Sequence, residues 1–384
     1  MAQWNRVPLI DYIELIGGGT PKTTVPEYWN GNIPWLSVKD FNNDKRYVYS
    51  TEKHISQSGF ENSPTKMLHK DDIIISARGT VGEIAMIPFD MAFNQSCYGI
   101  RASRGIGKPF LYYLLKNCIS QLKRMTHGSV FDTITRDTFA NIEVDIPDAE
   151  TQKRISSVLA DIDNKIEVND AINDNLQQQA AALFSSLYDR TNTEVRFTDL
   201  IQILGGGTPK TGENTYWNGN IAFFTPKDVG TPYTLITEKT ITEEGLSHCN
   251  SRLYPVNTVF VTARGTVGKV GMSGVPMAMN QSCYALVGKE THQLLVYFYT
   301  LKVVDRLKHK ASGAVFDAIT TKDFESEQIM KLSDDDARAF LCIAEPMFQK
   351  VLNNCIENLR LSTLRDSLLP KLMSGEIDVS AVQL

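Results

Sequence analysis

The sequence predicts a mixed α+β fold with two similar globular α/β domains, separated along the chain by two long helices that form an antiparallel coiled coil. Three observations support this pseudo-twofold symmetric architecture: an internal repeat, short β-rich runs ending in glycine-containing turns, and a heptad pattern after each copy. We place the first domain (head 1) at residues 1–149 and the first helical region at 150–190. The second domain (head 2) covers 191–333, and the second helical region 334–384.

The internal repeat covers most of each globular domain. Its spacing drifts only from 188 to 185 residues, so the two copies differ by few insertions and each half is one copy of one fold. The matching segments are 17–23 with 205–211, 28–33 with 216–221, 39–40 with 227–228, 51–53 with 237–239, 77–82 with 263–268, 94–98 with 280–284, and 130–135 with 315–320.

Each copy begins with strands and turns and continues into helices. Residues 72–76 and 257–262 are β-rich runs that lead into glycine-containing turns, which is typical of strands. Residues 111–122 carry apolar side chains at helical spacing, and 294–307 are their counterpart in the second copy.

The two helical regions carry apolar residues at alternating steps of four and three. The first seam consists of Ile155, Leu159, Ile162, Ile166, Asn169, Asn173, Leu176, Ala180, Leu183 and Leu187. The second consists of Phe340, Ala344, Met347, Val351, Asn354, Asn358, Leu361, Arg365, Leu368 and Leu372. The second seam is poorer, because it contains Arg365 and has Pro346 near its start.

Both seams carry two asparagines at the same internal positions, near the middle of each helix. Only an antiparallel pairing brings middle to middle and keeps the globular copies at opposite ends. We therefore expect Asn169, Asn173, Asn354 and Asn358 to meet near a pseudo-twofold axis and fix the register. The alternative is that they face solvent on two unrelated surface helices.

Composition limits the classes of protein that this chain can be. At 384 residues and 42% hydrophobic content, two or three globular units are expected. No basic segment with an apolar run opens the sequence, and no stretch is apolar enough to span a membrane. The six cysteines form no paired motif, which indicates reduced thiols in a cytoplasmic protein.

The net charge of −5 is unusual for a nucleic-acid binder, but the acidity is unevenly distributed. Head 1 holds 16 basic and 16 acidic residues and head 2 holds 14 and 13, whereas each helical region has a net charge of −3. A near-neutral domain can still bind DNA if its basic side chains lie on one face.

The Gly-Gly-Gly-Thr-Pro-Lys runs at 17–22 and 205–210 invite comparison with a phosphate-binding loop. That loop needs glycine directly before the lysine, and here Pro21 and Pro209 stand there. A tight structural turn is therefore favoured. A contact from Lys22 or Lys210 to a DNA phosphate remains the alternative.

Several repeated polar residues are candidates for DNA contact. Arginine can hold guanine bidentately or bind phosphate, and asparagine and glutamine can hold adenine. Each candidate could equally stabilise its own turn, and lysines at a helix end also suit the helix dipole. The candidates are Lys22, Lys39, Arg78, Asn94, Gln95, Lys123, Arg124, Lys210, Lys227, Arg264, Asn280, Gln281, Lys308 and Lys310.

Two further repeated residue types are better explained by structure than by chemistry. Trp29 and Trp217 are expected in the core instead of serving as stacking platforms, and Asp132 and Asp317 are expected to anchor turns. No catalytic constellation or metal site emerges, because the six histidines are scattered and lack ligand spacing. None of them recurs at the matching position of the other copy, which argues against a duplicated active site.

Taken together, the motifs resemble one family. Two copies of a Gly-Gly-Gly-Thr-Pro turn with Tyr-Trp-x-Gly-x-Ile, each followed by a long helix, resemble the specificity subunits of type I restriction-modification systems. Residues 368–378 look like the distal end of that family's second helical region. The resemblance covers nearly the whole chain.

The resemblance implies a non-catalytic subunit with two target-recognition domains, each reading one half of a split site in double-stranded DNA. It further implies that two modification subunits dock on the helices and methylate adenine with S-adenosylmethionine. Restriction subunits that use ATP and Mg²⁺ would join them. Accordingly, the chain lacks both a Walker-type loop and the Asn/Asp-Pro-Pro-Tyr/Phe motif of adenine methyltransferases.

Two other classes remain open at this stage. One is a standalone pseudo-dimeric DNA-binding regulator, which would bind its site tightly without partners. The other is a nuclease or methyltransferase with an unrecognised site, which would show activity as a purified chain.

Overall fold

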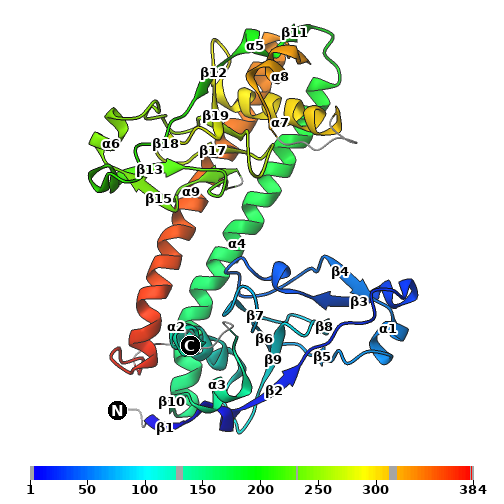
Figure 1. The fold of residues 1–384 in the computed structure, drawn as a ribbon, viewed down its shortest axis with the longest axis vertical. Coiled ribbons are helices and arrows are strands. Elements are labelled where there is room, and N and C mark those ends of the chain that lie inside the picture. The colour runs from blue at the N-terminus through cyan, green and yellow to red at the C-terminus, as the bar shows by residue number, and fades with distance from the viewer. Residues whose placement is uncertain (1–3, 127–132, 231, 311–317, 381, 383–384) are drawn as a thin grey trace. The chain divides into compact units, whose positions relative to one another are not determined.

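The computed structural model describes residues 4–126, 133–230, 232–310, 318–380 and 382 (Figure 1). Its internal contacts divide the chain into two units, which we name unit 1 (residues 1–167 and 360–384) and unit 2 (168–359). Two helices of 40 residues, α4 (Ala149–Tyr188) and α9 (Asp334–Met373), each contribute one segment to each unit. The prediction of two similar mixed α/β domains and two long helices is confirmed.

The remaining helices are short apart from one in each head. The α-helices are α1 (Gln57–Glu61), α2 (Lys108–Thr126), α3 (Arg136–Ala140), α5 (Phe197–Leu200), α6 (Glu243–Ser247), α7 (Gln293–Lys310) and α8 (Thr321–Ser326). The 3-10 helices are η1 (Leu9–Tyr12), η2 (Pro26–Tyr28), η3 (Val38–Asp40) and η4 (Asn214–Tyr216).

The described residues of head 1 form three sheets. Their strand orders are β2-β9-β6-β7, β4-β3-β8-β5 and β1-β10, and all the pairings are antiparallel except β3 with β8. The strands are β1 (Trp4–Pro8), β2 (Ile13–Gly17), β3 (Trp29–Leu36), β4 (Lys53–Ile55), β5 (Met67–Leu68), β6 (Ile73–Ser76), β7 (Ile84–Met86), β8 (Met91–Phe93), β9 (Cys97–Ala102) and β10 (Glu143–Pro147).

Head 2 repeats this plan. The strand orders are β12-β19-β16-β17-β14, β15-β13-β18 and β11-β20, with parallel pairing of β13 with β18 and of β14 with β17. The strands are β11 (Glu194–Arg196), β12 (Ile201–Gly205), β13 (Trp217–Phe224), β14 (Tyr233–Thr234), β15 (Lys239–Ile241), β16 (Val259–Thr262), β17 (Val270–Ser273), β18 (Met277–Met279), β19 (Cys283–Gly288) and β20 (Gln328–Met330).

The central strands are where the sequence placed them, but they begin slightly later. β6 and β16 are buried along their whole length, as their runs of apolar residues predict. β16 begins at Val259 instead of 257 because Asn257 has a φ of 69°, a left-handed conformation that belongs to the preceding turn. Asp71, with a φ of 66°, has the same role before β6.

Each unit closes its main core with residues from both long helices. In unit 1, Ile155 of α4 and Leu372 of α9 lie in one cluster with Leu111 of α2 and Ile75 of β6. In unit 2, the corresponding cluster combines residues of α4, α9, α7 and β16. A head and the helix segments beside it therefore form one apolar core.

Within unit 2 the two helix halves run antiparallel, and the structure brings the four seam asparagines together. The Asn354 side chain donates from Nδ2 to Asn173 Oδ1 at 2.8 Å, and Asn169 donates from Nδ2 to Asn358 Oδ1 at 2.8 Å. Asn169, Asn173 and Asn354 are all buried, so these residues do not face solvent. Their pairing fixes the register, because a shift would leave buried amides without partners.

The buried pair of Asn173 and Asn354 should therefore contribute to stability as a coupled pair. Asn173→Ala removes the acceptor of a buried amide and should lower the free energy of unfolding by about 1–3 kcal/mol. Replacing both Asn173 and Asn354 by Leu should recover this loss, because among the described residues Asn354 Oδ1 is already buried without a partner. Urea unfolding followed by circular dichroism measures both effects.

The exposed Asn353, next to the pair on α9, provides the matched control, and Asn353→Ala should change stability by less than about 0.5 kcal/mol. A double leucine variant that is destabilised as much as the two single variants combined would contradict the coupled pair.

Candidate nucleic-acid interface

The glycine-rich turn of each head packs against the Asn-Gln turn. A Cβ on Gly206 would lie 2.3 Å from the carbonyl oxygen of Asn280, and one on Gly18 would lie 2.1 Å from that of Asn94. Only glycine allows so close an approach. The hydroxyl of Thr208 donates to Gln281 Oε1, as Thr20 does to Gln95. The glycine-rich segment is therefore a tight structural turn, which is the interpretation that the sequence favoured.

Each asparagine of the Asn-Gln turn stabilises its own loop. Asn280 Oδ1 accepts the backbone N–H of Ser282 at 3.0 Å, and Asn94 Oδ1 accepts that of Ser96 at 3.1 Å. The same serines accept a backbone N–H from each arginine turn, that of Arg264 at 3.3 Å and that of Arg78 at 3.2 Å. The two turns are thus tied together in both heads.

The arginine turns expose their guanidinium groups. Gly265 and Gly268 have φ values of 83° and 75°, which bend the chain sharply after β16. Arg264 and Arg78 are both exposed, and with the described residues neither side chain makes a hydrogen bond or ion pair. Both guanidinium groups thus lie at the surface of the described part of the structure.

The Lys-Asp turns are held by their aspartates. Asp228 accepts the backbone N–H of Thr225 at 2.8 Å and that of Glu238 at 2.7 Å. Asp40 does the same in head 1, with Ser37 and Glu52 at 2.7 and 2.8 Å. The carboxylates fix the loops, and the lysines that precede them, Lys227 and Lys39, lie at the surface.

In unit 2 these turns border one open groove of about 530 Å³. Its lining residues are Thr225, Pro226, Lys227, Glu238, Lys239, Arg264, Gly265, Thr266, Asn280 and Ser282. Three cations and one carboxylate give it a positive balance although head 2 is nearly neutral, and the carboxylate, Glu238, lies 3.7 Å from the Lys227 ammonium. Such a groove suits an anionic ligand.

Only some of the sequence candidates belong to this groove. The structure places Lys227, Arg264 and Asn280 there together, and Gln281 beside them in the adjoining turn. Lys210 and Lys22 lie outside the lining, and their backbone carbonyls accept the indole N–H groups of Trp217 and Trp29 at 3.2 Å. The two indoles support the turns, but they are half-buried beside small apolar clusters, so the predicted core position is only partly met.

The lysines at the helix ends lie apart from the groove. The Lys123 and Lys308 stems pack over Gly82 and Gly268, which line other hollows. Lys310 forms an ion pair with the buried carboxylate of Glu327. The Arg124 side chain and the residues Asp132 and Asp317 lie outside the described part of the structure.

Sequence reasoning overlooked other groove residues. Glu238 and Lys239 line the groove, and Thr266 joins its two sides by donating its hydroxyl to the Pro226 carbonyl at 3.2 Å. The repeat could have pointed to these residues, because the Thr-Glu-Lys and Arg-Gly-Thr segments that contain them recur in both copies. Lys239 also lies 5.6 Å from the centre of the Trp217 ring, a cation–π contact that Lys53 and Trp29 repeat at 5.7 Å.

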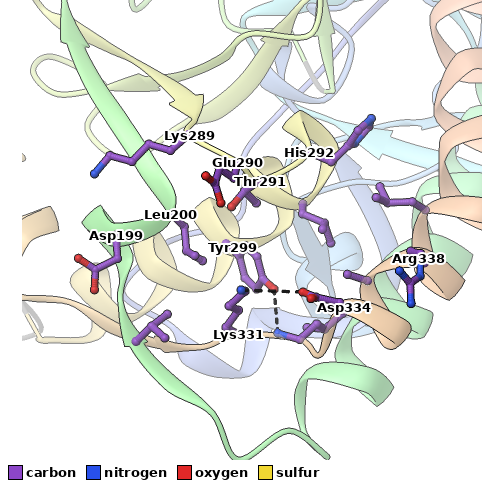
Figure 2. A pocket seen from close by; sticks show the side chains of 15 residues that line it. Asp199, Leu200, Lys289, Glu290, Thr291, His292, Tyr299, Lys331, Asp334 and Arg338 are labelled. Atoms are coloured by element: carbon purple, nitrogen blue, oxygen red, sulfur yellow. Dashed lines mark hydrogen bonds and ion pairs between the residues drawn. The ribbon is translucent and has the colours of Figure 1, made fainter.

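A second hollow in unit 2, of about 850 Å³, lies at the start of α7 (Figure 2). Charges of both signs line it, and Lys331 there lies 4.0 Å from Asp334. In unit 1 the position of Ala337 is taken by Gln152, which accepts the backbone N–H of Gly107 and donates to the carbonyl of Pro147, both at 2.9 Å. The two units therefore differ at this place, since the corresponding side chain in unit 1 is larger and is held by two hydrogen bonds.

The repeated cysteines and the described acidic and histidine side chains are the groups on which metal or thiol chemistry would depend. No group of three or more His, Cys, Asp or Glu residues there could hold a metal ion. Burial raises the pKa of Cys97 and of Cys283 to about 12, so these repeated thiols stay protonated and are poor nucleophiles. None of the described helices combines the length and apolar character that crossing a bilayer requires.

Comparison with known proteins gives a consistent picture. The model of the type I restriction modification DNA specificity domain matches residues 1–178 and 190–331. The chain is 24% identical to the type I restriction enzyme MjaIX specificity subunit of Methanocaldococcus jannaschii, over 98% of this chain and 94% of that protein. It is also 24% identical to the HindI specificity subunit of Haemophilus influenzae, over 70% of this chain and 77% of that protein.

A solved structure shares the fold. The S subunit of a type I restriction-modification system from M. genitalium superposes with a TM-score of 0.58 at 15% identity, covering 97% of this chain and 96% of that one. Two matched domains, one relative aligned over nearly the full length and a shared architecture agree with one another. The chain belongs to the family of type I restriction-modification DNA specificity subunits.

Proposed function

We propose that the chain is a non-catalytic specificity subunit that reads a bipartite site in double-stranded DNA, one half with each head. The observation that carries this proposal is the positive groove of head 2, whose charged lining residues all recur in the sequence of head 1. Positively charged grooves attract the DNA backbone and supply most of the sequence-independent binding energy.

The residues that the two heads share suggest what the groove contacts. Lys227, Glu238, Lys239, Arg264 and Asn280 correspond to the same residue types at 39, 52, 53, 78 and 94. If the two heads read different half-sites, shared side chains are suited to what the half-sites have in common, which is the phosphate backbone. Base reading then falls to loops that differ between the heads.

Partners follow from the same proposal. Two modification subunits would dock on the helical regions and supply S-adenosylmethionine-dependent adenine methylation, which requires the adenine to be flipped out of the stack. Restriction subunits would supply ATP- and Mg²⁺-dependent translocation and cleavage. This chain's part is to bind, orient and space the DNA.

Removing the groove cations should weaken binding to all sequences alike. Lys227→Ala with Arg264→Ala should reduce DNA affinity and lower the slope of log K against log salt by about one for each phosphate that is no longer neutralised. Titration of the modification complex with fluorescent duplexes at several salt concentrations measures both quantities. Lys322→Ala removes an exposed lysine of head 2 outside the groove and serves as the control. A changed target sequence with unchanged salt slope would assign base reading to the groove instead.

The purified chain should neither methylate nor cleave DNA, and adding its modification subunit should produce adenine methylation. Assays with S-adenosylmethionine, and separately with ATP and Mg²⁺, test this directly. Turnover by the chain alone would make it an enzyme, whereas tight site-specific binding with no effect of the partner would favour a standalone regulator.

Exchanging one head should change one half-site. Replacing residues 1–149 by the same region of a relative should alter the bases read on one side and leave the other half-site unchanged. Sequencing-based methylation mapping in a host gives the result. A change on both sides would contradict independent reading by each head.

A further inference from the structure

The two units differ sharply at one equivalent place in their cores. The repeat relates helix residues 185 positions apart, as the first residues of α4 and α9, Ala149 and Asp334, illustrate. Unit 1 has Tyr113, Asp163 and Arg365 where unit 2 has Phe298, Phe348 and Ala180 respectively. All six residues are buried. One copy thus has an ionic cluster where the other is aromatic and aliphatic.

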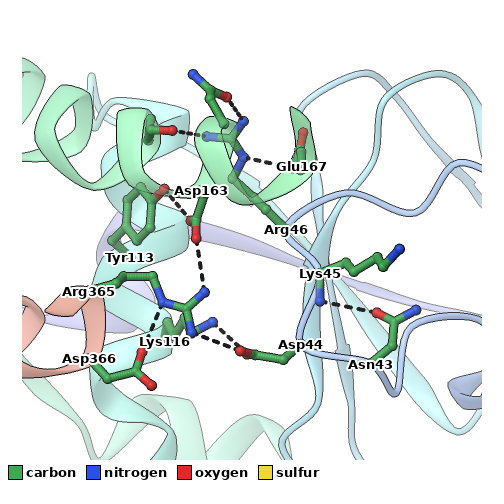
Figure 3. Close-up of polar contacts among 12 residues, drawn as sticks. Asn43, Asp44, Lys45, Arg46, Tyr113, Lys116, Asp163, Glu167, Arg365 and Asp366 are labelled. Atoms are coloured by element: carbon green, nitrogen blue, oxygen red, sulfur yellow. Dashed lines mark hydrogen bonds and ion pairs between the residues drawn. The ribbon is translucent and has the colours of Figure 1, made fainter. Parts of the chain in front are cut away.

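In unit 1, Arg365 is the centre of the cluster (Figure 3). Its side chain is 4% exposed and donates from Nη1 to Asp163 at 2.9 Å and from Nη2 to Asp44 at 2.8 Å. The second oxygen of Asp163 accepts the Tyr113 hydroxyl at 2.6 Å. The guanidinium also donates from Nε to Asp366 at 2.9 Å. Every polar end of the buried pair therefore has a partner.

The cluster joins the head to both helices. Asp44 comes from the loop after β3, Tyr113 from α2, Asp163 from α4 and Arg365 from α9. Lys116 of α2 adds a 2.7 Å contact to Asp44. Burial opposes ionisation of Asp44, but Lys116 and Arg365 outweigh it and keep the pKa of that carboxyl below its ordinary value. Four segments of chain are thus held by complementary charge.

In unit 2 the equivalent helices meet without charge. The Phe298 and Phe348 rings lie 5.5 Å apart, and Phe184 stacks on Phe298 at 5.0 Å. Ala180 is fully buried in the same core cluster as these rings. Phe184 stands where unit 1 has Leu369.

The two solutions cannot be mixed. A head 1 that met the second half of α4 instead of the second half of α9 would bury Asp163 against Ala180, with no cation to pair it. A head 2 that met the second half of α9 would bury Arg365 among aromatic rings. Buried unpaired charges are strongly disfavoured, whereas each matched set is self-sufficient. Such exclusion of wrong partners is how paired helices achieve specificity.

We propose that these two sets act as pairing determinants, which make α4 pair with α9 and prevent like halves of this chain from pairing with one another. The partner excluded is a second copy of the same half, which the internal repeat would otherwise fit. The ionic set in unit 1 allows head 1 to pack only against the second half of α9. The aromatic set in unit 2 allows head 2 to pack only against the second half of α4.

The first test uses the intact chain. Arg365→Ala alone should lower the melting temperature by roughly 10 °C, because it leaves the buried Asp163 carboxylate without its cation. Asp163→Phe alone should also lower it, because the buried Arg365 then keeps only the exposed carboxylates of Asp44 and Asp366. The set Tyr113→Phe, Asp163→Phe, Arg365→Ala and Leu369→Phe installs the residues of unit 2 and should melt within a few degrees of the wild type. A set variant that is destabilised as much as the single variants combined would overturn the proposal.

The second test measures pairing itself. A protease site inserted between Asn192 and Thr193, both exposed, allows the folded chain to be cut into residues 1–192 and 193–384. The nicked protein is unfolded in urea, refolded and examined by native mass spectrometry. Wild-type fragments should return only as mixed pairs. The set variant should form at least about tenfold more pairs of two 1–192 fragments, because the phenylalanine introduced at position 163 would then face Ala180 and Phe184 of the second copy.

Arg338→Ala, which removes an exposed ion pair with Asp335 on the same helix α9, is the matched control and should behave as the wild type. Equal amounts of like pairs from wild-type and set-variant fragments would show that the clusters do not select partners. DNA binding enters neither test, so their failure would leave the proposed function untouched.

Discussion

The structure depends on one constraint: neither head can complete its core without helix segments from two distant parts of the chain. Head 1 buries its apolar surface against the start of α4 and the end of α9. Head 2 uses the end of α4 and the start of α9. Helix register therefore decides which side chains each head meets, and an error of one residue would misplace the packing in a core. The paired asparagines and the Arg365 cluster both act on that register.

The electrostatics follow from where the charge is placed. A chain with a net charge of −5 carries its acidity on the helical regions, while the groove of head 2 gathers three cations around a single carboxylate. In the turns that carry these cations, the other polar side chains make hydrogen bonds within the head itself. Asp228 binds its own loop, Asn280 its own turn and Thr208 the neighbouring glutamine. The lysine and arginine heads at the surface are what remains for a ligand, which is why a nearly neutral domain can present a basic surface.

Much of this architecture could be predicted because periodic patterns in the sequence indicate it. The heptad steps located both long helices, and the asparagines at matching steps predicted an antiparallel pairing. The groove could be predicted only in part. Lys227, Arg264 and Asn280 were recognisable as polar residues of repeated turns, but Glu238 and Lys239 reach the same groove from β15 and the residue just before it. That neighbourhood is created by strand pairing of β13 with β15, which no local pattern reveals.

Conversely, the structure changes the meaning of Arg365. In the sequence it interrupts an apolar seam and weakens the second heptad pattern. In the fold its three carboxylate partners come from residues 44, 163 and 366, two of them far away in the sequence. By the repeat alone the two copies are equivalent, and this position is a defect in one of them. In the packed cores, this position belongs to a fully paired ionic cluster in unit 1, and the equivalent position belongs to an aromatic cluster in unit 2. A duplicated fold whose halves remained fully interchangeable would have no side-chain contact that favours its own complement over a second copy of the same half, and only the covalent link between the halves would favour it. Departures from the repeat are thus as informative about assembly as the repeat is about fold.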